Sequence, residues 1–334
     1  HAVENVQSEL SGVVCGMEAE EQRAIDEAMI ALDGTAHKER IGANAILAVS
    51  LAVAKAQAIS EKKQLHEHIT ALSGKEIVPL LPLPMCNLIN GGKHAAHSTD
   101  IQEFMVIPLG ADAFSHAVQM STEVFHALKG VLQEKGYGTT VGDEGGFAPR
   151  VQHGNKEALE LLSVAVEKAG YTLGSDVAFA IDAAASEFQN EGGEYVLAAE
   201  KKTFSCTELV SFYEMLAKEF PLISIEDGLG EGDWAGWVDL TARMGETVQL
   251  VGDDLLVTNT AFLQRAIDEK AANAILVKLN QIGTLTETID AVLLAQKNNF
   301  NAIVSHRSGE TEDTAIAHLA VGLGAGQIKT GSMS

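Results

Sequence analysis

Six apolar runs in the chain each end in a residue that carries charge or exchanges a proton. The runs read VAFAID, LISIED, VQLVGDD, NAILVKLN, NAIVSHR and GQIKTG. Their polar ends are, in order, Asp182, Glu226, Asp253, Lys278, His306 and Lys329. Burying a lysine ammonium is costly unless a partner compensates its charge. Lys278, directly after the apolar residues Ala-Ile-Leu-Val, therefore indicates a functional role.

The first three polar ends indicate a metal site. Asp182, Glu226 and Asp253 would repel one another at a common point unless a cation lay between them. Oxygen ligands without His or Cys suit Mg²⁺ or Mn²⁺ rather than zinc. A single acid after a strand is more often a helix N-cap, but three in succession, followed by a basic series, favour a metal.

The basic residues that follow favour an anionic substrate and a proton-transfer step. A lysine that is crowded by cations and partly desolvated, as Lys278 would be, can act as a base. The alternative interpretation is that Lys278 has no chemical role and that its ammonium group reaches solvent at the rim of the fold. Arg307 and Ser308 in SHRSGETED are suited to clamp a phosphate with a guanidinium and a hydroxyl, and their alternative is a polar loop.

Two segments upstream supply further candidate acids. INGGKHAAHSTDIQEF contains His94 and Glu103, and TTVGDEGGFAPR contains Asp143 and Glu144. Acids beside paired glycines lie on tight backbone, which suits a substrate lid or a general acid. A surface turn would have the same spacing, so this pattern alone leaves both readings open.

The spacing of the polar ends predicts the fold that must position them. From residue 226 to 329 they follow one another at intervals of about 25 residues, the length of one strand, one helix and two loops. Short apolar strands between helices predict a parallel sheet, and this many units favour a β/α barrel. A doubly wound sheet is the alternative, although no GxGxxG follows an early strand.

The chain before the barrel is predicted to be helical. Helices are expected within 18–34 and 41–59, and later within 113–136 and 156–170. The proline-rich stretch at 78–92 marks a boundary, so the predicted domains are 1–74 and 75–334. The apolar tract at 41–59 carries Asn44, Ser50, Lys55 and Gln57, which favours a packed helix over a membrane span.

Composition excludes several classes of function. The formal net charge of −23 across 334 residues argues against direct nucleic-acid binding, because phosphates require a basic surface. Cys15, Cys86 and Cys206 show no metal-ligand spacing and are expected to be reduced thiols of a cytoplasmic protein. No signal peptide opens the chain, and no membrane span is expected.

Taken together, six motifs in this order resemble enolase, the phosphopyruvate hydratase of glycolysis, in its bacterial form. They are VGDEGGFAP, SIEDGL, VGDDLLVTN, VKLNQIGTLTET, SHRSGETEDT and GQIKTGSMS. The resemblance runs from DGTAHKERIGANAILAVSLA to the last residue. It implies an enolase-type β/α (TIM-like) barrel over 75–334 and the helical remainder of an N-terminal α+β capping domain over 1–74.

The resemblance implies a reaction, the reversible dehydration of 2-phosphoglycerate to phosphoenolpyruvate by a lyase. Lys278 matches the base that removes the C2 proton, and Glu144, with Glu103 beside it, matches the acid that helps the C3 hydroxide leave. Lys329 matches the lysine that steadies the substrate carboxylate and its enolate. The same pairing of a base with Mg²⁺ is described for enolase-superfamily sites in general.

The resemblance also implies ligands and partners. The expected ligands of the first of two Mg²⁺ ions are Asp182, Glu226 and Asp253. The expected substrate-binding residues are His94, His306, Arg307, Ser308 and Lys329. The expected partner is a small phosphorylated carboxylate, and the expected assembly is a homodimer or a ring of dimers.

This sequence departs from the family pattern at three places. The family's longer capping domain contains a Ser-Gly-Ala-Ser-Thr-Gly loop, whose serine ligates the second Mg²⁺, and this loop is not found here. The family also continues past GSMS, and Ala96, His97 and Ser98 stand where bacterial relatives often have Asp-Asn-Asn. Two alternatives to the hydratase stay open: an inactive or weakly active enolase-like binding or scaffold protein, and another carboxylate enzyme of the enolase superfamily.

Overall fold

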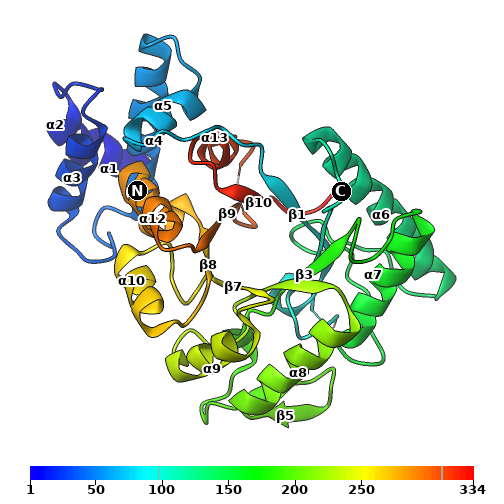
Figure 1. Ribbon diagram of the computed structural model, residues 1–334. Coiled ribbons are helices and arrows are strands. Elements are labelled where there is room, and N and C mark those ends of the chain that lie inside the picture. The colour runs from blue at the N-terminus through cyan, green and yellow to red at the C-terminus, as the bar shows by residue number, and fades with distance from the viewer. Residues whose placement is uncertain (97, 310) are drawn as a thin grey trace. The chain divides into compact units, whose positions relative to one another are not determined.

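Eight strands form a closed barrel in a computed structural model that describes residues 1–96, 98–309 and 311–334 (Figure 1). The order around the barrel is β1-β10-β9-β8-β7-β6-β3-β2. The strands are β1 (Leu83–Asn90), β2 (Glu103–Ile107), β3 (Ala178–Asp182), β6 (Leu222–Glu226), β7 (Gln249–Gly252), β8 (Ala274–Val277), β9 (Asn301–Ser305) and β10 (Gly326–Lys329). His97, part of one sequence departure, lies outside the described residues.

All six predicted runs are strands, but the sheet is mixed rather than parallel. β2 runs antiparallel to both β1 and β3, whereas the pairs β3–β6, β6–β7 and β1–β10 are parallel. The expectation of a wholly parallel sheet was therefore wrong. A short connection across 91–102, whose described residues include the 3₁₀ turn η2 (Gly92–His94), joins β1 to β2, and a parallel pair would need a longer crossover.

The antiparallel strand brings an additional acid to the edge of the barrel where the parallel strands end. Asp182 and Glu226 are the last residues of their strands and are paired in register. Because β2 runs the opposite way, its first residue, Glu103, lies opposite Asp182 on one side and opposite Asn90, the last residue of β1, on the other. The direction of β2 and the register of its pairing therefore bring these carboxylates close together.

Helices occupy the connections and the N-terminal region. Before the barrel these are α1 (Ala2–Asn5), the π-helical turn η1 (Val6–Leu10), α2 (Ser11–Val14), α3 (Gln22–Asp33), α4 (Ala43–Ser60) and α5 (Leu65–Leu72). Between strands they are α6 (Phe114–Glu134), α7 (Lys156–Lys168), α8 (Cys206–Glu219), α9 (Trp234–Met244), α10 (Thr260–Glu269), α11 (Leu279–Ile282), α12 (Leu285–Lys297) and α13 (Ala315–Gly322). The turn η3 (Ala185–Phe188) and the hairpin β4 (Tyr195–Leu197) with β5 (Lys202–Phe204) follow β3.

The chain divides into two compact units. Unit 1 comprises residues 1–82, 256–264 and 275–326, and unit 2 comprises 83–255, 265–274 and 327–334. In unit 1 the N-terminal helices enclose an apolar core that includes Ile25, Met29 and Ile46. In unit 2 the helices α6 and α7 lie side by side (Figure 1).

Buried polar residues of unit 1 connect the N-terminal helices to α12 by hydrogen bonds. The carboxylate of Asp26 on α3 accepts a hydrogen bond from the backbone N–H of Thr286 at 3.0 Å. The hydroxyl of Ser50 on α4 accepts one from Leu285 at 3.0 Å. The first N–H groups of a helix lack partners within it, so side chains from α3 and α4 cap α12.

The helix α4 is long and apolar enough to cross a membrane by length and composition alone. Core helices of folded proteins meet the same criterion. Ser50, near its middle, is fully buried and makes the contact with α12 described above. The interactions of α4 are thus those of a helix packed within unit 1.

Candidate active site

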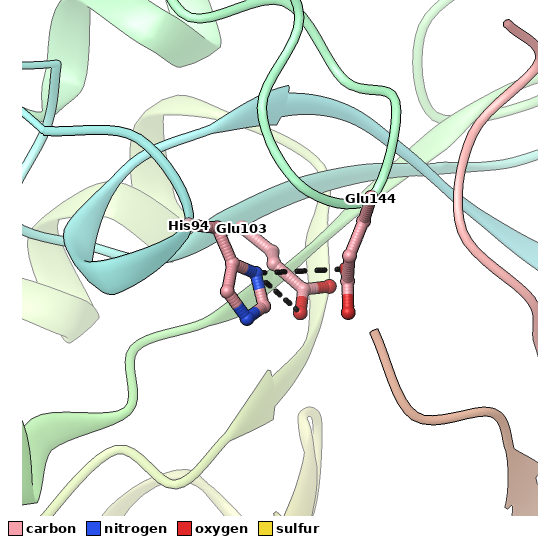
Figure 2. A group of neighbouring side chains, drawn as sticks. All are labelled: His94, Glu103 and Glu144. Atoms are coloured by element: carbon pink, nitrogen blue, oxygen red, sulfur yellow. Dashed lines mark ion pairs between the residues drawn. The ribbon is translucent and has the colours of Figure 1, made fainter. Parts of the chain in front are cut away.

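Three side chains of unit 2 converge beside the ends of β1 and β2. Figure 2 shows the ring of His94 facing two glutamates: its Nδ1 lies 3.7 Å from Oε1 of Glu103 and 3.7 Å from Oε2 of Glu144. Both glutamate side chains are almost fully buried, with 2% and 4% of their surface exposed. His94 and Asp143 also line a cavity of about 560 Å³, a volume that suits a small metabolite.

Lys329 lies among the carboxylates at this edge. Its Nζ is 3.0 Å from Oε2 of Glu103, 3.3 Å from Oδ2 of Asp182 and 3.1 Å from Oε1 of Glu226. Burial alone would lower the pKa of Lys329, but Glu103, Glu226 and Asp182 together raise it well above its usual value. The ammonium is therefore the resident positive charge of the cluster.

One cation does not neutralise this many acids. Burial raises the pKa of Glu103 well above its usual value; Lys329 opposes this shift, whereas Glu144 and Asp182 add to it. A carboxyl group in such surroundings favours its protonated form. The cluster thus combines a charged lysine and ionisable acids, with a histidine 3.7 Å from two of these acids.

Glu144 lies on a loop that contacts both β1 and the C-terminal segment. The amide Nδ2 of Asn87 on β1 donates to Oε2 of Glu144 at 3.0 Å, and the backbone N–H of Ser332 donates to the carbonyl of Glu144 at 3.1 Å. Sequence reasoning did not identify Asn87. The signal available was a polar residue inside the otherwise apolar run MCNLI.

The three predicted metal ligands lie at the ends of neighbouring strands, with Asp253 directly after β7, and the structure holds them in two different settings. Asp182 and Glu226 share Lys329, as described above. Asp253 instead joins Asp227 and Asp254 in a cluster of close carboxylates, in which Asp227 accepts hydrogen bonds from the N–H groups of Asp253 and Asp254 at 2.9 and 2.8 Å. Asp227 was also missed from the sequence.

The donor chemistry of these residues fits Mg²⁺. Asp182, Glu226 and Asp253 are all buried, with 5%, 1% and 7% exposure, and carboxylates that stay charged when buried are paired with a cation or coordinate a metal. All offer oxygen, the donor that Mg²⁺ prefers. His94, Glu103 and Glu144 form the other described group of three whose ligand atoms lie within 4.8 Å of one another.

Lys278 belongs to unit 1, where it directly follows β8. Its backbone N–H donates to Oγ1 of Thr258 at 2.9 Å. Thr258 is fully buried and, with Val257, has a positive φ (58° and 41°). Non-glycine residues adopt this backbone region only where the surroundings enforce it, often at functional sites. The end of β8 is thus anchored by a strained turn.

The predicted phosphate-binding residues are also in unit 1. His306 follows β9 directly, and Arg307 and Ser308 come next. Arg307 and Ser308 line a cavity of about 700 Å³ whose wall includes Leu279 and Asn280 of α11. A guanidinium and a hydroxyl on one cavity wall are suited to an anionic group.

The candidate site residues are therefore divided between the two units. Unit 2 brings together the acids, the histidine and the lysine of its edge, namely His94, Glu103, Glu144, Asp182, Glu226 and Lys329, with Asp253 in the neighbouring cluster. Unit 1 holds Lys278, His306, Arg307 and Ser308.

The fold and this site define a class of protein: α/β barrels that carry acid–base and anion-binding groups at the ends of their strands. Comparison with family models identifies the member of this class. The model described as "Enolase, C-terminal TIM barrel domain" matches residues 78–334, and "Enolase, N-terminal domain" matches residues 1–69. The chain belongs to the enolase family, a family of lyases that dehydrate 2-phosphoglycerate and use Mg²⁺.

Proposed function

We propose that this chain catalyses the reversible, Mg²⁺-dependent dehydration of 2-phosphoglycerate to phosphoenolpyruvate in glycolysis and gluconeogenesis. The observation that carries the proposal is the buried cluster of Glu103, Glu144 and Lys329 in a chain of this family. Such a cluster offers both a proton donor and a fixed positive charge, and the reaction needs both.

The difficult step is removal of a proton next to a carboxylate, because the carbanion adds a second negative charge to the same group. In the proposed mechanism the amine of Lys278 takes the C2 proton. The ammonium of Lys329 stabilises the resulting enolate from a buried, preorganised position. Its location among carboxylates ensures that it is charged before substrate arrives.

The second step breaks the C3–O bond. The carboxyl of Glu144 gives its proton to the C3 hydroxyl oxygen, the electron pair of the enolate forms the C2=C3 double bond, and water leaves. His94 lies beside both glutamates, with its Nδ1 at 3.7 Å from each of them. General acid catalysis of this kind typically contributes about 10²–10⁴-fold.

The remaining candidates bind rather than react. Arg307 and Ser308 would hold the phosphate, and His94 and His306 would contact the substrate. Asp182, Glu226 and Asp253 would hold Mg²⁺, which when bound supplies positive charge that stabilises the doubly charged carboxylate.

The proposal includes the organisation of the protein. The helical segment 1–74 would act as part of a capping domain and 75–334 as the catalytic barrel. The protein is proposed to work in the cytoplasm as a homodimer or a ring of dimers, on a small phosphorylated carboxylate.

The test is ultraviolet detection of phosphoenolpyruvate formed from 2-phosphoglycerate in the presence of Mg²⁺. We expect turnover that disappears with a chelator, and that falls at least about 10³-fold in Lys278→Ala, because the base is lost. Lys297→Ala, a lysine in the last turn of α12, is the control. Folded protein that binds Mg²⁺ but shows no turnover would overturn the proposal and favour a binding role.

A further inference from the structure

Asn87 is a fully buried amide that lies behind the proposed acid. Resting on the proposed function, we infer that Asn87 is a positioning residue: its amide fixes the carboxyl of Glu144 so that the transferable proton resides on Oε1 and is presented to the leaving hydroxyl.

The strand β1 gives Asn87 a fixed position. Its backbone N–H donates to the carbonyl of Gly331 at 3.0 Å, and the residue pairs with Met105 of β2. The register of this pairing shifts between Asn87 and Ile89. Irregularities of this kind re-aim side chains and are common beside active sites. The backbone that carries the Asn87 amide is thus fixed on both sides.

The loop that carries Glu144 is held mainly through its backbone. The N–H of Gly142 donates to the carbonyl of Gly146 at 2.8 Å, and the N–H of Phe147 donates to that of Leu88 at 2.8 Å. Gly145 has φ +87°, a conformation that favours glycine. These bonds place the Cα of Glu144 but leave its side-chain torsions to be set by other contacts.

The contact from Asn87 sets these torsions and distinguishes the two carboxyl oxygens. Nδ2 of Asn87 donates to Oε2 at 3.0 Å, and Nδ1 of His94 lies 3.7 Å from the same atom. An oxygen that already accepts an N–H bond is the poorer location for a proton of its own, so the proton of a protonated Glu144 is placed on Oε1. Transfer then breaks the Oε1–H bond as the C3–O bond breaks, and the amide stabilises the carboxylate that remains.

The experiment separates the two halves of the reaction. In D₂O, base-catalysed removal and return of the C2 proton labels 2-phosphoglycerate with deuterium, and this exchange does not need the acid. For Asn87→Ala with Mg²⁺ we expect dehydration to slow by about 10- to 100-fold, as for partial loss of acid catalysis, while exchange stays within about twofold of wild type. Asn87→Leu, which keeps the volume, should behave in the same way if the alanine variant folds poorly.

Asn90→Ala is the matched control. Asn90 is also fully buried on β1, its amide makes no hydrogen bond among the described residues, and its side chain packs against Gly142 and Gly146 of the same loop. Its removal therefore tests the loss of packing behind that loop without the loss of a hydrogen bond to Glu144. A parallel fall of both rates in Asn87→Ala, or no fall in dehydration, would overturn the inference. Wild-type protein that neither exchanges nor dehydrates would instead refute the proposed function.

Discussion

At the scale of single residues, Lys329 determines the charge balance of the acidic edge. Only 3% of its side chain is exposed, and three carboxylates lie within 3.3 Å of its Nζ. A buried ion pair gives little net stability relative to apolar residues. Removing one partner is different, because the remaining charges are then buried without compensation.

Lys329→Met should therefore destabilise the metal-free protein strongly. We expect a loss of about 3–5 kcal/mol in the free energy of unfolding, the typical cost of breaking a buried pair. Urea unfolding in the presence of a chelator measures it. Lys93→Met is the control, because its pair with Glu187 is exposed and such pairs contribute little. Equal losses in both variants would contradict the assigned role of Lys329.

At the scale of elements, two stacked histidines lie where α5 packs against α13. The rings of His66 and His318 are 5.8 Å apart between centroids, with planes only 12° from parallel. Burial lowers the pKa of His318, and His66 and Lys55 lower it further, whereas Asp313 opposes them. His318 therefore binds a proton less readily in the folded protein than in the unfolded chain.

This difference predicts acid sensitivity. Above about pH 6.5, the usual value for histidine, neither state carries the proton at His318 and no penalty exists. As pH falls below 6.5 the unfolded state binds more protons, so stability decreases toward and through the folded pKa. The urea midpoint should drop less between pH 7.5 and 5.5 in His318→Gln than in wild type. His116→Gln, at an exposed site, should retain the wild-type drop.

The elements also show how far the sequence could predict this protein. Six strands were predictable because each apolar run ends in a polar residue, and from Glu226 to Lys329 these ends recur at regular spacing. The same pattern placed Asp182, Glu226 and Lys329 at one edge. β1 was obscured by prolines, which mark boundaries as often as strand starts. The direction of β2 depends on tertiary pairing, so the proximity of Glu103 to Asp182 and Lys329 could not be derived from spacing. Because β1 was not predicted as a strand, Asn87 was not identified either.

At the scale of the whole molecule, the net charge of −23 complicates any test for a specific cation site. A strongly acidic surface attracts every cation, and added salt screens its self-repulsion. A buried site differs in two respects: it saturates at a defined concentration, and it depends on particular buried carboxylates. Glu226, with 1% exposure, is one of the proposed ligands, whereas Glu20 is an exposed acid.

Mg²⁺ should therefore stabilise the protein more than NaCl of equal ionic strength. Binding to the folded state alone adds about 2.7 kcal/mol to the free energy of unfolding at 100 times the dissociation constant, so the melting temperature should rise and then level off. Glu226→Gln should lose most of this increment, and Glu20→Gln, with the same change in charge, should retain it. If NaCl matches MgCl₂, or if Glu226→Gln keeps the full increment, the Mg²⁺ effect belongs to the surface field and not to the carboxylates at the strand ends.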